Sequence, residues 1–147
     1  MADGVEQGLI APHGGRLNPR EVRGDAADPR FGTPTYVYDL DAIEADAREL
    51  DAAFDGAPHL VAYAVKANSA GPIVQTLRAA GCGADVVSGA ELMLALRCGV
   101  APDHIVYSGV AKTDEELDLA VAAGGAGLGA IQVESVEEVV GIAARAR

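Results

Sequence analysis

Four apolar segments, each followed by a helical pattern, recur along the chain and constrain its fold more than any other feature. The segments begin near residues 59, 84, 104 and 130, so the unit repeats roughly every 20 to 26 residues. Segments that are apolar on both faces and alternate with helices are typical of a parallel sheet covered by helices. The repeat therefore predicts an α/β fold, and both an open doubly wound sheet and a TIM barrel satisfy it.

The expected elements follow from this pattern. Strands are expected at 59–65, 84–87, 104–107 and 130–133, and helices at 71–80, 90–97, 114–123 and 135–146. A further short strand at 35–38 is expected before a helix at 40–54, for which Asp39 offers an N-cap. Ser135 and Glu138 have the spacing of a capping box at the start of the last helix.

The repeat also predicts how the chain is organised. Residues 1–30 are rich in Gly, Pro, Asp and Arg without periodicity, and we interpret them as an irregular N-terminal arm. The four units that follow are half of an eight-unit barrel, which takes about 250 residues. The chain stops at Arg147 inside helical sequence, with no Gly or Pro stop signal. We therefore expect these units to be part of a larger fold.

Charge and composition exclude several classes of function. A net charge of −11 argues against nucleic-acid binding, because a run of phosphates could not be neutralised. The sequence contains no run of 18 apolar residues and no basic N-terminal region, so we expect a cytoplasmic protein without a membrane span. Cys82 and Cys98 are interpreted as apolar fillers, and the three histidines are too scattered for a metal site.

Lys66 is the most informative single position. It follows an apolar run, which places it at the carboxyl end of a buried strand, where parallel α/β folds bind ligands. An amine that is desolvated at this edge can attack a carbonyl group. By position alone, however, a lysine that closes a strand usually returns the chain to water. The neighbouring sequence has to decide between these interpretations.

The sequence around Lys66 resembles a known motif. Tyr63-Ala64-Val65-Lys66-Ala67-Asn68 is similar to the cofactor-lysine motif of the fold-type III pyridoxal-phosphate decarboxylases. Four further segments resemble, in order, the opening segment and the second, third and fourth barrel strands of the diaminopimelate decarboxylase family: 31–39, 85–92, 105–113 and 132–135. The match is collinear from Phe31 to the end of the chain. Five such segments in order, with natural spacing, make the resemblance specific.

The resemblance implies a fold and an assembly. The family folds as a TIM barrel of the alanine racemase-like type followed by a β-rich domain, and its active form is a homodimer. Residues 31–147 would then form the first four βα units of a pyridoxal-phosphate-binding barrel, without the second half-barrel and the β-domain.

The resemblance also implies an activity. The reaction is the pyridoxal 5'-phosphate-dependent decarboxylation of meso-2,6-diaminopimelate to L-lysine and CO2, a carboxy-lyase step of lysine biosynthesis. One alternative is an ornithine/arginine-type or carboxy-amine decarboxylase of the same superfamily. An alternative of another class is a non-catalytic regulator derived from the barrel.

Three residues carry over from the family as site residues. Lys66 would hold the cofactor, Asp85 would lie near it and orient its amine, and Glu91 matches another recurrent family acid near a helix start. The structural alternative for Asp85 is a carboxylate bonded to backbone amides. Lys112 is interpreted as a solvated charge. The glycine run at 124–129 precedes a strand, so it is interpreted as a helix C-cap and turn rather than a dinucleotide loop.

Further functional parts of the family lie beyond Arg147 in the resemblance. They are the phosphate-binding glycines, the acid that pairs with the pyridine nitrogen, and a cysteine region donated by the partner subunit. We therefore expect the isolated chain to be catalytically inactive and to bind pyridoxal phosphate weakly. Open strand edges and an uncovered apolar face also predict self-association.

Overall fold

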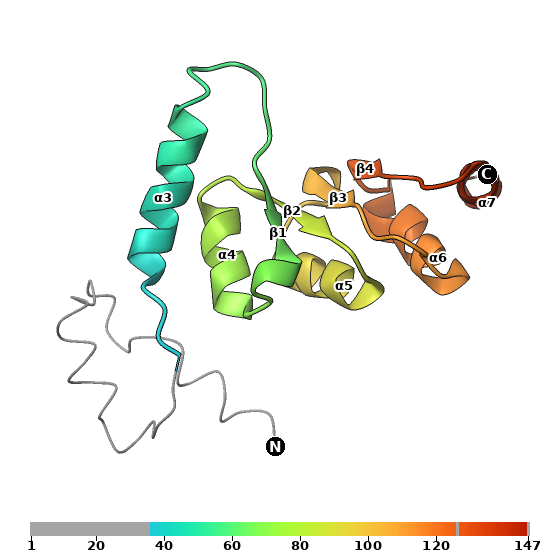
Figure 1. The fold of residues 1–147 in the computed structure, drawn as a ribbon, viewed down its shortest axis with the longest axis horizontal. Coiled ribbons are helices and arrows are strands. Elements are labelled where there is room, and N and C mark those ends of the chain that lie inside the picture. The colour runs from blue at the N-terminus through green and yellow to red at the C-terminus, as the bar shows by residue number, and fades with distance from the viewer. Residues whose placement is uncertain (1–35, 126, 147) are drawn as a thin grey trace.

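The computed structural model describes residues 36–125 and 127–146, and its centre is one parallel sheet (Figure 1). The strands are β1 (Ala62–Ala64), β2 (Gly83–Val86), β3 (Ile105–Tyr107) and β4 (Ala130–Ile131). They lie in the order β1-β2-β3-β4, and every neighbouring pair is parallel. In this register Asp85 of β2 lies between Ala64 of β1 and Val106 of β3.

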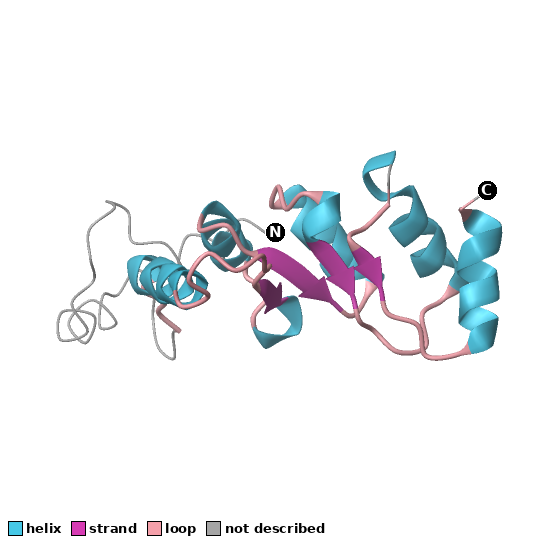
Figure 2. Cartoon of the chain, turned by 90° about the horizontal axis from the view of Figure 1, so that it is seen from above, coloured by secondary structure: helices cyan, strands magenta, loops and turns pink. Residues whose placement is uncertain are grey.

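The helices show which of the two parallel architectures is present. In the described part of the chain they are α3 (Leu40–Ala52), α4 (Gly71–Ala79), α5 (Gly89–Arg97), α6 (Asp114–Ala122) and α7 (Val136–Arg145). Each of α4, α5 and α6 connects one strand to its immediate neighbour, and the units advance in one direction from α3 to α7, as Figure 2 shows. A doubly wound sheet reverses direction, so its strand order is not sequential. The four units are therefore the first part of a TIM barrel, as the resemblance implied.

Two apolar clusters hold the units together. The larger one combines alternate strand residues, such as Val86 and Ile105, with residues of α5 such as Leu92. The smaller one joins α3 to α4 and includes Ala47 and Leu77. Because successive strand residues point to opposite faces, the residues between the core positions lie on the other side of the sheet. Cys82 and Cys98 are buried and free, which confirms their interpretation as apolar fillers.

The segment before α3 differs from its prediction. Residues 36–39 have no regular structure, and Tyr36 is 80% exposed. β-branched and aromatic residues favour a strand only where a neighbour accepts their backbone hydrogen bonds, and none of the four strands of the sheet pairs with this segment. The helix after it is confirmed, since Asp39 accepts a hydrogen bond from Ala42 N at 3.1 Å. The proposed arm at 1–30 lies outside the described residues.

The first strand is shorter than expected. Residues 59–61 precede β1 outside the strand, and of these Val61 O accepts a hydrogen bond from Gly83 N at 2.9 Å. The His59 ring stacks on Phe54 with centroids 4.0 Å apart, and its Nε2 lies 3.0 Å from Asp51 Oδ1. These contacts hold His59 against the end of α3, and the strand register with β2 begins at Ala62.

Two turn predictions have different outcomes. Ser135 Oγ accepts from Glu138 N at 3.1 Å, but the Glu138 carboxylate accepts from Glu134 N instead of Ser135 N, so only half of the capping box forms. The glycine run is confirmed as a helix end and turn, because Gly127 N donates to Ala123 O and Gly127 has a φ of +80°. No helix in residues 36–125 and 127–146 is both long and apolar enough to span a membrane.

Candidate active site

Lys66 lies at the carboxyl end of β1, in a single 3-10 turn that spans Val65–Ala67. Val65 is fully buried in the larger cluster and anchors this turn. After the turn, Tyr63 Oη donates to Asn68 O at 3.0 Å, and Asn68 Oδ1 accepts from Ala70 N at 3.0 Å. The backbone is therefore held on both sides of Lys66. The Lys66 residue itself is exposed, as a lysine that closes a strand usually is, and its amine is therefore not desolvated.

Asp85 lies on the neighbouring strand. It pairs with Ala64, two residues before Lys66, and it alternates with the core residues Ala84 and Val86. Its Oδ1 accepts a hydrogen bond from Ser108 Oγ, just beyond β3. The partner is a side chain, so the alternative of a carboxylate bonded to backbone amides does not hold. Within residues 36–125 and 127–146, no ion pair joins Lys66 to Asp85.

Glu91 lies in the first turn of α5. Its Oε2 accepts from Val87 N at 2.9 Å, and its own backbone N donates to Ser88 Oγ at 3.3 Å. The side chain thus closes the turn between β2 and α5. The structure places Glu91 in the first turn of the helix that follows Asp85, and its carboxylate makes a structural hydrogen bond with the preceding turn.

The same arrangement recurs in the next two units. A Ser or Thr N-cap is followed three residues later by a glutamate that accepts a backbone N–H from its own loop: Ser88 and Glu91, Thr113 and Glu116, Ser135 and Glu138. Glu116 also accepts from Gly89 N at 2.7 Å, which ties the start of α6 to the start of α5. Hydrogen bonds from Thr113 N and Gly89 N lower the pKa of Glu116. The Ser/Thr-x-x-Glu spacing was visible three times in the sequence, but sequence analysis identified only the last.

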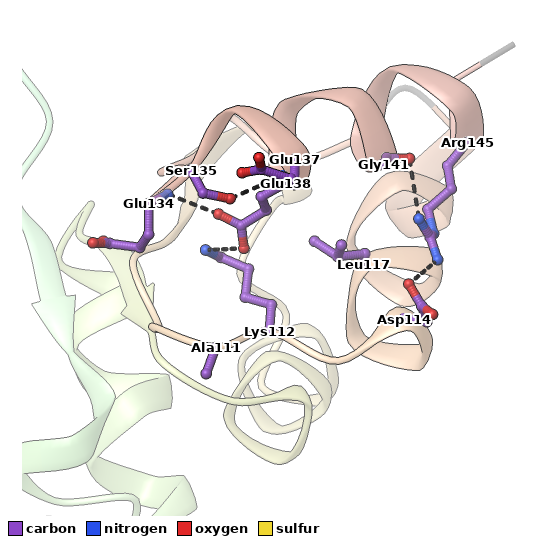
Figure 3. Close-up of a pocket in the computed structure, with 10 residues that line it drawn as sticks. All are labelled: Ala111, Lys112, Asp114, Leu117, Glu134, Ser135, Glu137, Glu138, Gly141 and Arg145. Carbon is purple, nitrogen blue, oxygen red and sulfur yellow. Dashed lines mark hydrogen bonds and ion pairs between the residues drawn. The ribbon is translucent and has the colours of Figure 1, made fainter.

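The environment of the Lys112 side chain contradicts the interpretation of this residue as a solvated charge. Its side chain is 0% exposed, and its Nζ donates to Gln132 O at 2.6 Å. The same Nζ donates to Glu138 Oε1 at 3.0 Å (Figure 3). The ammonium also lies 5.7 Å from the centroid of the Tyr107 ring. A carbonyl, a carboxylate and an aromatic face thus replace the water that a buried ammonium needs. Lys66 and Lys112 are the only two lysines of the chain, so the exposed one is Lys66.

The turn after β3 approaches the turn after β2 very closely at Gly109. A Cβ at this position would lie 2.3 Å from Val87 O and 2.8 Å from Val87 C. Ser108 N donates to Val86 O at 2.9 Å, which extends the pairing of β2 and β3 up to this point. The loop can lie here only because Gly109 has no side chain.

Replacing Gly109 with alanine tests this close approach. We expect Gly109→Ala to lower the free energy of unfolding by about 1–3 kcal/mol, because backbone atoms cannot move away as a side chain can. Urea denaturation measures it. The matched control is Gly141→Ala in α7, where the nearest atom is the flexible end of Arg145 at 3.3 Å, and we expect no loss of stability there. Equal effects of the two substitutions would contradict the close approach.

Comparison with known proteins places this chain in a family. Residues 40–147 match the family described as pyridoxal-dependent decarboxylase, pyridoxal binding domain. The chain belongs to this family, and the cofactor implied by the resemblance is confirmed at that level. Diaminopimelate decarboxylase of Pseudomonas fluorescens is 44% identical over 125 residues, which cover 85% of this chain and 29% of that protein. The Pseudomonas aeruginosa diaminopimelate decarboxylase is 45% identical over 109 residues, 74% of this chain and 26% of the relative.

The solved structures that resemble this chain include decarboxylases, in agreement with the family match. Diaminopimelate decarboxylase from Helicobacter pylori, complexed with L-lysine, superposes with a TM-score of 0.72 at 35% identity, covering 85% of this chain and 30% of that one. Ornithine decarboxylase from Entamoeba histolytica gives a TM-score of 0.59 at 30% identity, covering 71% of this chain and 31% of that one. This chain therefore spans less than a third of the length of these relatives.

Proposed function

We propose that this chain is the first part of the barrel of a pyridoxal-phosphate-dependent amino-acid decarboxylase, with Lys66 as the cofactor anchor. The observation that carries the proposal is the contrast between two lysines. Lys66 is exposed on a held turn at the carboxyl edge of the sheet, and Lys112 is buried in an ion pair. An aldehyde cofactor needs an accessible amine, and active sites of parallel barrels lie at this edge.

The residues around Lys66 fit the cofactor. Asp85 presents a half-buried carboxylate on the adjacent strand, beside the residue two positions before Lys66. In the proposed site Asp85 orients the Lys66 amine, and Glu91 contributes by holding the turn that follows Asp85. When bound, pyridoxal phosphate supplies an electron sink for the bond that breaks at the substrate Cα.

The proposed substrate is meso-2,6-diaminopimelate, which would be converted to L-lysine and CO2. Supporting this, several relatives at 41–48% identity are diaminopimelate decarboxylases. The ornithine decarboxylase is the weaker match, both in identity and in TM-score. We further propose that residues 31–147 belong to the barrel of a longer, cytoplasmic protein that acts as a homodimer.

The activity test uses the complete protein that contains this segment. We expect release of CO2 from meso-diaminopimelate, with kcat/KM about 100-fold or more above that for ornithine, because a site built around a distal polar group rejects analogues that lack it. We expect no turnover by the 147-residue chain alone. A preference for ornithine would favour the alternative substrate class. Absence of turnover on any amino acid would favour the non-catalytic regulator.

A further inference from the structure

The turn after β3 holds Ser108 in a fixed position. Its backbone N donates to Val86 O, and the next residue, Gly109, lies against the Val87 backbone with no room for a side chain. On β3, Ile105 and Tyr107 belong to the larger cluster on the helix side. By alternation Ser108 therefore extends toward the opposite side of the sheet, the side of Asp85. Two independent contacts of the backbone thus fix where the Ser108 hydroxyl lies.

The Ser108 hydroxyl forms a hydrogen bond with only one oxygen of the Asp85 carboxylate. Ser108 Oγ donates to Oδ1, and within the described residues Oδ2 accepts no hydrogen bond. A carboxylate that is held through one oxygen cannot rotate freely, yet it keeps the other oxygen as an acceptor. The register places Ala64 beside Asp85, and the Lys66 turn follows directly.

We propose that Ser108 is a positioning residue, which fixes the Asp85 carboxylate through Oδ1 and so keeps Oδ2 available to the Lys66 amine. This inference rests on the proposed function, in which Lys66 anchors pyridoxal phosphate. Ser108 acts through Asp85 and does not itself contact the cofactor. Its contribution therefore depends on the presence of the Asp85 carboxylate.

The test uses a favourable property of the chain, which has only two lysines, one of them buried. The chain is incubated with pyridoxal phosphate, the adduct is trapped with borohydride, and the labelled peptide is quantified by mass spectrometry. We expect Ser108→Ala to slow labelling of Lys66 about 3- to 10-fold, the size of one ordinary net hydrogen bond, because Ser108 acts on Lys66 only through Asp85. Ser108→Thr keeps the hydroxyl and should restore labelling to within about twofold.

A double-mutant cycle separates positioning from folding. In an Asp85→Ala background, Ser108→Ala should change labelling by less than about twofold, because the group on which it acts is gone. An unchanged 3- to 10-fold loss in that background would overturn the proposal. So would equal labelling of the Ser108→Ala variant and the unaltered chain.

The same variants are also unfolded in urea without pyridoxal phosphate. If the effects of the Ser108 and Asp85 substitutions on the free energy of unfolding are not additive, the hydrogen bond between the two residues is supported independently of Lys66. Additive effects would overturn that hydrogen bond. If the unaltered chain is not labelled at Lys66, the proposed anchor fails. The unfolding cycle then decides separately whether Ser108 holds Asp85.

Discussion

Replacing Lys66 with methionine is expected to abolish borohydride-trapped pyridoxal phosphate at this site and to lower kcat of the complete enzyme by about 10³-fold or more. Methionine has a similar length but no nucleophilic nitrogen, so neither attachment of the aldehyde nor proton transfer by the amine remains. Trapping followed by peptide mass spectrometry measures the first effect. Release of CO2 measures the second.

Two controls make this result specific. Lys66→Arg keeps the positive charge but not the nucleophilic amine, so we expect it to be as unreactive as methionine. Because Lys66 is exposed, the free energy of unfolding should change by less than about 0.5 kcal/mol in either variant. Label on the peptide that contains Lys112, together with retained turnover in Lys66→Met, would contradict the assignment.

Much of the fold could be predicted because buried parallel strands differ clearly in sequence from what surrounds them. Segments such as 104–107 are apolar on both faces and lie between helical patterns, and β3 was found there. The segment at 35–38 has the same β-branched and aromatic composition, yet its described part is not a strand. Composition indicates that a segment tolerates extended structure, whereas pairing depends on a neighbour that only the folded chain supplies.

The candidate site was predictable only in part, for a similar reason. Lys66 could be identified from its place after an apolar run and from the motif around it. The partner of Asp85 is Ser108, 23 residues away, and the partner of Lys112 is Glu138, 26 residues away. Each pair joins neighbouring βα units. The spacing of residues within one unit does not predict the register between two units. Sequence analysis therefore treated Lys112 as solvated and did not identify Ser108.

The buried pair of Lys112 and Glu138 leads to the largest expected effect on stability. Removing the ammonium by Lys112→Met leaves the Glu138 carboxylate without its cation, and we expect a loss of about 3 kcal/mol in the free energy of unfolding. This is the low end for a buried pair, because the Glu138 side chain keeps 11% exposure. Adding Glu138→Gln removes the uncompensated charge and keeps an acceptor for Glu134 N, so part of the loss should be recovered.

The matched control is the exposed pair of Arg48 and Glu44 on α3, whose side chains are 59% and 39% exposed. We expect Arg48→Met to cost about 0.5 kcal/mol or less, since water screens this pair. Both variants are measured by urea denaturation at neutral pH. An effect of Lys112→Met as small as that of Arg48→Met would mean that Lys112 is solvated, as its sequence context predicted.

The loss of stability expected for Lys112→Met depends on pH. Hydrogen bonding from Glu134 N, assisted by Lys112, lowers the pKa of Glu138 below its ordinary value of 4.5. A carboxylate with a lowered pKa in the folded state adds stability above its ordinary pKa, and this stability is lost as the pH falls through the folded-state pKa. The difference between Lys112→Met and the unaltered chain should therefore be full at neutral pH and shrink below about pH 4.5. A difference that stays constant down to pH 3 would indicate that Lys112 acts through packing rather than through its charge.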